Sequence, residues 1–112
     1  MSFFDSDVVR KEMTDIQDLQ EEIYDSVFTF PQMPKEEKEE HIELLMELLE
    51  KQRILYARMS LSDDPAAKKM KENIQQSAVI MGMPKDVDMA HVFSNMEKMI
   101  GIMKQQVDNI SS

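Results

Sequence analysis

The longest uninterrupted run of helical periodicity in the chain lies between residues 34 and 60. Apolar positions recur there at steps of three and four, which is the spacing of one face of an α-helix. One stripe comprises Ile42, Leu45, Leu49, Gln52, Tyr56 and Met59, and a second stripe beside it comprises Leu44, Leu48 and Leu55. An apolar face of this width predicts a helix that contacts two or three other helices rather than one.

A second helix is predicted for residues 7–30, after a possible cap at Asp5 or Ser6. The seven-residue repeat on which it rests comprises Val9, Ile16, Ile23 and Phe30. This seam favours antiparallel or coiled-coil-like packing. The segment from Pro31 to Pro34 then interrupts the helix, and it is short enough for an antiparallel hairpin with the helix of residues 34–60. The preceding pair, Phe3 and Phe4, is expected to pack against the first turns.

Two further helices are predicted in the second half of the chain. Residues 65–81 carry a narrow apolar stripe between a cap at Asp64 and a stop at Gly82. Residues 87–109 follow a cap at Asp86 or Asp88, and their longer stripe comprises Met89, Phe93, Met96, Ile100, Met103, Val107 and Ile110. Four helices and no convincing strand predict a single all-α domain over residues 1–112. We expect an elongated four-helix bundle or a pair of helical hairpins, completed by dimerisation.

The formal net charge of −9 is concentrated in the first half of the chain. Residues 1–64 have 17 acidic and 7 basic side chains, whereas residues 65–112 have 5 and 6. An acidic chain repels phosphate backbones, so direct binding to nucleic acid is disfavoured. The charge either keeps a helical protein in solution or docks the acidic half on a basic surface of another protein. No apolar run approaches the length of about 20 residues that spans a membrane, and no signal peptide is evident.

Few residues are suited to catalysis or metal binding. The chain has no cysteine, and neither His41 nor His91 has a second ligand at a suitable spacing, so both are expected on helix surfaces. Straight-helix geometry directs the glutamates between Glu36 and Glu50 to several sides, which disfavours a calcium or magnesium site. No Ser/His/Asp arrangement or glycine-rich phosphate loop is detectable. The sequence therefore predicts a protein that is not an enzyme and has no cofactor.

Methionine is unusually frequent, with 12 residues in the chain. Six of them fall within 23 residues: Met81, Met83, Met89, Met96, Met99 and Met103. Their helical spacing favours core packing, while their flexible side chains also suit an adaptable protein-binding or dimer surface. Clustered thioethers can in addition bind Cu(I), which is a third and weaker interpretation.

Three segments resemble a family of small proteins with a domain of unknown function, found in cyanobacteria and in viruses that infect them. The opening from Phe3 to Ser6 with Val8-Val9 is the most distinctive match. The segment from Arg53 to Asp64, and Gly82-Met83 before a methionine-containing final helix, are similar at lower density. The resemblance implies no activity or catalytic residue. It implies a cytoplasmic setting in a bacterial cell, with either the host or a virus encoding the chain.

The sequence most favours a non-enzymatic, acidic interaction protein that forms a homodimer. The residues expected at the apolar interface are Leu48, Leu55, Met89, Met96 and Met103. The alternative is a viral effector that redirects a host complex, such as the transcription or photosynthetic machinery, through its acidic half. Its candidate contacts are Glu36, Glu37, Glu39 and Glu40. A metal-binding bundle is the least favoured hypothesis.

Overall fold

The computed structural model describes residues 2–80, 82–86 and 88–110, and every regular element in these ranges is helical. The four α-helices are α1 (Asp7–Ser26), α2 (Lys35–Ser60), α3 (Pro65–Ile80) and α4 (Met89–Asp108). Two short 3-10 helices, η1 (Phe3–Asp5) and η2 (Val27–Gln32), precede and follow α1. The predicted all-α fold is therefore confirmed.

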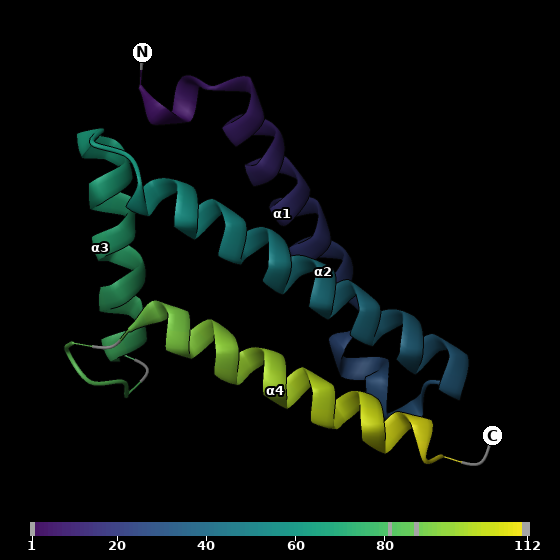
Figure 1. The fold of residues 1–112 in the computed structure, drawn as a ribbon. Helices are drawn as coiled ribbons and strands as arrows, with labels where there is room; N and C mark the ends of the chain where they lie inside the picture. The colour runs from purple at the N-terminus through teal and green to yellow at the C-terminus, as the bar shows by residue number, and fades with distance from the viewer. Residues whose placement is uncertain (1, 81, 87, 111–112) are drawn as a thin grey trace.

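Helix α2 occupies the centre of the molecule (Figure 1). Both α1 and α4 run antiparallel to it on either side, and α3 crosses the end at which α2 stops and α4 begins. Within the described residues, α2 packs on α1, α3 and α4, whereas α1 and α4 make hardly any contact with each other. The result is an open layer of helices, 51 × 32 × 20 Å in extent.

Two apolar cores lie on different sides of α2. Ile42 and Leu49 pack against α4, where Phe93, Ile100 and Val107 are buried in the same cluster. Helix α1 buries the stripe of Val9, Ile16, Leu19 and Ile23, and α2 is its principal neighbour. The prediction that the wide face of α2 contacts several helices is thus confirmed.

The first helix ends earlier than its periodicity predicts. Instead of running through residues 7–30, α1 stops at Ser26 and continues as η2. The Ser26 hydroxyl donates hydrogen bonds to the preceding carbonyl oxygens of Glu22 and Ile23, each at 3.3 Å. The β-branched Val27 and the nearby Pro31 disfavour further α-helix, and the chain tightens into the 3-10 form.

The other boundaries agree closely with the sequence patterns. Pro34 occupies the cap position of α2 rather than its first turn. The Asp88 carboxylate accepts a hydrogen bond from the Ala90 N–H at the start of α4, and Gly82 adopts a φ of 102° after α3. The predicted end residues 81 and 87 lie outside the described residues.

Asp64 joins the N-terminal segment to the start of α3. Its carboxylate accepts hydrogen bonds from the N–H groups of Phe3 and Ala66, both at 2.8 Å. These backbone donors hold the pKa of Asp64 below its ordinary value. Phe3 and Phe4 are half-buried and stack edge to face, with ring centroids 5.1 Å apart. The pair packs as predicted, although its position is fixed by the turn between α2 and α3.

Replacing Leu49 by Ala is expected to lower the free energy of unfolding by about 2–4 kcal/mol, because it opens a cavity between α2 and α4. Urea unfolding at one fixed protein concentration measures this change. Leu61→Ala is the matched control, since Leu61 is 89% exposed, and it should change stability by no more than about 0.5 kcal/mol. Equal effects of the two substitutions would contradict this assignment of the core.

Candidate interaction surface

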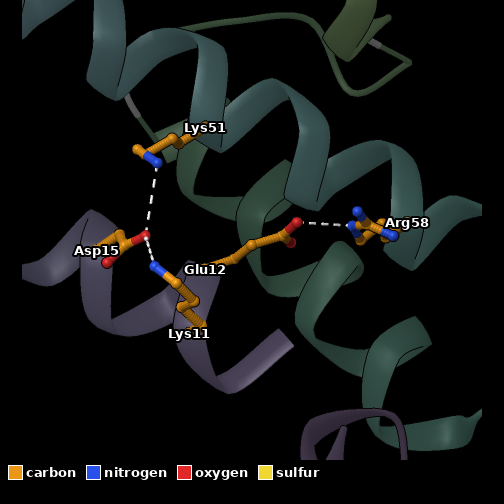
Figure 2. Close-up of polar contacts among 5 residues, drawn as sticks. All are labelled: Lys11, Glu12, Asp15, Lys51 and Arg58. Carbon is orange, nitrogen blue, oxygen red and sulfur yellow. Dashed lines mark hydrogen bonds and ion pairs between the residues drawn. The ribbon is translucent and has the colours of Figure 1, made fainter. Parts of the chain in front are cut away.

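One side of the helical layer is polar and carries the ion pairs between helices. Figure 2 shows Asp15 of α1 between Lys11 and Lys51, with nitrogen-to-oxygen distances of 3.3 and 3.5 Å. Glu12 lies nearby and accepts from the Arg58 Nε at 2.8 Å. Burial raises the pKa of Asp15, but the two lysines outweigh it and leave the pKa below its ordinary value. These contacts fasten α1 to α2 along one edge.

An equivalent contact joins α2 to α4. The Arg53 guanidinium lies 3.0 Å from the Glu97 carboxylate and 3.1 Å from Glu50 on its own helix. At about 100° of rotation per residue, Arg53 and the Lys51–Arg58 edge flank the exposed glutamates 43, 47 and 50 of α2. The ion pairs therefore border the same, outward side of the layer.

The opposite side of the layer is apolar and incompletely covered. By the same helical rotation, a different set of side chains from α1, α2 and α4 is directed toward this second side. Val27 and Ile110, just beyond the ends of α1 and α4, extend the set. These residues, called the apolar face below, are Met13, Val27, Leu45, Leu48, Leu55, Met96, Met99, Met103 and Ile110. The leucines and Met103 are half-buried and the others are exposed, with Met99 the most exposed at 65%. Exposed apolar residues that gather in this way are typical of a protein-binding surface.

The residues predicted at an apolar interface are divided by the fold. Leu48, Leu55, Met96 and Met103 belong to the apolar face. Met89 does not, because it is only 7% exposed and packs in the core between α2 and α4. The methionines are thus divided between the core, as at Met89, and the exposed surface, as at Met96 and Met99.

The predicted acidic contacts are available to solvent. Glu36, Glu37 and Glu40 are exposed, and Glu39 is half-buried, in the first turns of α2. Their negative charge lies near the positive end of the helix dipole, which stabilises this end of α2. Accessible carboxylates here are compatible with a basic partner, and they also have this purely structural role.

His41 is buried, which corrects the expectation of a surface histidine. Its side chain is 5% exposed because η2 folds back and brings the Phe30 ring centroid to 5.1 Å from the imidazole. His41 Nδ1 contacts the Ser26 hydroxyl at 3.2 Å. Burial disfavours the charged ring and lowers the pKa of His41. His91 is exposed on α4, as expected.

The Ser26–His41 contact has the atoms of a catalytic pair but not its geometry. The serine hydroxyl lies within hydrogen-bonding distance of two carbonyl oxygens of α1, to which it donates. Among the described residues, the His41 side chain makes its hydrogen bond with Ser26. No carboxylate there orients the imidazole as a general base requires. The contact instead joins the end of α1 to the start of α2.

A hollow of about 720 Å³ lies where α2, α3 and α4 meet, and its lining includes Arg53, Tyr56, Lys71 and Phe93. Both of its cations are already engaged. Arg53 pairs with Glu97, and the Lys71 ammonium lies 5.7 Å from the centroid of the Tyr56 ring. Across the described ranges, no three histidine or carboxylate side chains converge as metal ligands. In the same ranges, no helix has the length and apolar character needed to cross a membrane.

An exposed aromatic pair escaped the sequence analysis. Tyr24 and Phe28 are 71% and 81% exposed, and their rings stack edge to face with centroids 6.5 Å apart. Large exposed aromatic side chains are frequent anchors in protein interfaces. The sequence could have indicated this pair, because both residues lie outside the seven-residue repeat by which α1 packs on α2. An aromatic residue outside that repeat has no helix of the chain to pack against.

The chain was compared with known protein families, curated proteins and solved structures. The model of a family described as a domain of unknown function, DUF1825, matches residues 1–107. The chain belongs to this family. The expected relationship to a family of unknown function is thereby confirmed, and the match includes α1, α2, α3 and all of α4 except its last residue. No curated protein and no solved structure matched.

The burial of His41 leads to a prediction about pH. The imidazole has a pKa below the ordinary value of 6.5 in the folded chain, so the unfolded chain binds the proton more readily. The free energy of unfolding should then decrease as the pH falls from about 6.5 toward 5. Chemical denaturation across this range measures the decrease, with protein concentration held constant.

His41→Gln should flatten that pH dependence, whereas the control substitution His91→Gln should leave it intact. Both aspartates with lowered pKa values titrate below 3.8, outside this window. An identical slope in the wild type and in His41→Gln would show that His41 is not the titrating group.

Proposed function

We propose that this protein is a non-enzymatic, acidic interaction protein that acts as a homodimer, with the apolar face buried between the two copies. The observation that carries the proposal is the amount of surface that the single chain leaves exposed. The polar side, with its carboxylates, then forms the outside of the assembly and remains accessible to other proteins.

The accessible area of the chain is 8081 Å². A compact monomer of 13.1 kDa would expose about 6,400 Å² by the usual scaling with mass. The excess of roughly 1,700 Å² exceeds the surface of about 800 Å² that each partner buries in a standard interface. A dimer can therefore form on this surface alone, without requiring any part of the chain to refold.

The shape of the chain supports the same proposal. Its radius of gyration is 16.1 Å, whereas a compact domain of this length has about 13 Å. The excess length and area are typical of an open layer, in which α1 and α4 both pack on α2 and leave its apolar side incompletely covered. A second copy placed there would give a more compact assembly.

The chemistry of the described residues is compatible with this role. His41 is engaged by the contact between α1 and α2, and both cations that line the hollow between α2, α3 and α4 have protein partners. Flexible methionines on the apolar face suit a surface that must adapt to another helix.

A charge placed on the apolar face should separate the two copies. Met99→Lys is expected to weaken self-association on the order of 100-fold, because an unpaired charge in an interface costs several kcal/mol and each 1.4 kcal/mol is a factor of ten. Light scattering over a dilution series, at low and high salt, measures the mass of the complex.

The matched control is Ile54→Lys, which places the same charge at a 41% exposed position on the polar side of α2. This variant should remain a dimer at the concentrations at which the wild type is one. A wild-type monomer at tens of micromolar would refute the homodimer, and a dimer that Met99→Lys leaves unchanged would move the interface elsewhere.

A second candidate function is that of an acidic viral effector that docks on a basic surface of a host protein. The exposure of Glu36, Glu37 and Glu40 favours it. Neutralising the cluster as Glu36→Gln, Glu37→Gln, Glu39→Gln and Glu40→Gln should abolish salt-sensitive capture of such a partner from host lysate. It should leave the dimer intact. Capture that persists unchanged would remove the acidic cluster from this function.

A further inference from the structure

We infer that the two copies meet through α4, antiparallel to each other, with Met103 at the two-fold axis. This inference rests on the proposed homodimer and specifies which helix crosses the interface and in which direction. It follows from the two seams of α4, from the distribution of charge among the helices, and from the position of α3.

Helix α4 has two apolar seams. The inner seam of Met89, Phe93, Ile100 and Val107 is buried in the cluster with α2. The outer seam comprises Met96, Met99 and Met103 of α4 together with Ile110, which lies two residues beyond the end of the helix, and these residues are separated by three, four and seven residues. This is the spacing at which a helix packs along another helix in a coiled coil. Met96, Met99 and Ile110 are exposed. Met103 is half-buried and packs with one side against the inner cluster, so a partner would cover its remaining exposed surface.

The angle between the seams determines where a partner helix would lie. At about 100° per residue, the outer seam is rotated by roughly 60° from the inner seam, toward the apolar face. When three helices pack in mutual contact, the directions from one helix to its two neighbours are about 60° apart. A helix packed on the outer seam would therefore also lie beside α2 and cover the half-buried Leu45 and Leu48. One contact would in this way bury the middle of the apolar face.

Charge selects α4 as the helix that meets its own copy. In a two-fold dimer, the segment at the axis faces itself, so its charges must not repel. Helix α1 has seven acidic and two basic side chains, whereas α4 has two of each. The residues of the outer seam, together with Gln106 between them, carry no charge. Two copies of α4 can meet without the repulsion that two copies of α1 would experience.

The direction follows from α3 and from the helix dipoles. Helix α3 has three lysines and one glutamate, and it lies at the end where α4 begins (Figure 1). A parallel contact would place two basic α3 helices at the same end and align the two α4 dipoles. An antiparallel contact separates the α3 helices and opposes the dipoles, which is electrostatically favourable.

An antiparallel contact centred on Met103 pairs the outer seams over their whole free length. Met96 would then lie opposite Ile110 of the partner subunit, and Met99 would lie near Gln106 of the partner subunit. The N-terminal part of α4 extends beyond this overlap. Its Met89 and Val92 are already buried within the same chain, so it needs no cover from the second copy.

Single-cysteine crosslinking tests the inference directly, because the natural chain has no cysteine. We expect Met103→Cys, treated with a short bismaleimide, to shift to twice the monomer mass on a denaturing gel. The control variant Ile54→Cys places a thiol at a more accessible position on the polar side, 41% exposed against the half-buried Met103, and should stay at the monomer mass. Light scattering of each variant before treatment shows whether it is a dimer.

A second pair of variants tests the direction independently of Met103. Met96→Cys and Ile110→Cys should each stay monomeric on the gel when treated alone, and should crosslink when the two proteins are mixed and allowed to exchange. Efficient crosslinking of either variant alone would indicate a parallel contact and overturn the inference.

The two levels of the proposal fail in different ways. A dimer by light scattering in which neither Met103→Cys nor the mixed pair crosslinks would overturn the α4 contact and leave the homodimer standing. A monomer by light scattering in the wild type would overturn both.

Discussion

Helix α2 can be long and only weakly amphipathic because different helices bury different stripes of its surface. Ile42 and Leu49 pack in the cluster with α4, whereas α1 buries its stripe of Val9, Ile16, Leu19 and Ile23 with α2 as its principal neighbour. Without α2, neither outer helix would have an apolar partner within the chain, since α1 and α4 hardly touch. The same dependence makes the molecule flat, because helices on two sides of a central rod form a layer rather than a closed bundle.

The two sides of this layer differ in the kind of contact that completes them. On the outward side, charged side chains such as Arg53 and Glu97 bridge neighbouring helices and keep their remaining surface in water. On the other side, half-buried leucines and exposed methionines form an apolar surface that the chain covers only in part. Ion pairs at this level of exposure contribute little stability, so their principal effect is to set the spacing and register of α1 and α4 on α2.

Periodicity was sufficient to predict the helices and the central role of α2, because a wide apolar face is buried only when several helices pack on it. It was insufficient wherever a residue is covered by something other than a regular helix. His41 is buried by Phe30, which arrives from a 3-10 turn that continues the seven-residue repeat without continuing the α-helix. Met89 and Met96 share one periodic stripe, yet Met89 is buried in the cluster with α2 and Met96 is 41% exposed, because periodicity does not state which turns of a helix other elements cover.

The hydrogen bonds to Asp64 have a consequence for the order in which the fold is completed. Phe3 precedes Asp64 by 61 residues, so its N–H has no partner until the residue that accepts it has also been made. The hairpin of α1 and α2 relies on contacts between adjacent elements and can form earlier. The segment around Phe3 is therefore fixed later than the hairpin that follows it, once the corner between α2 and α3 exists.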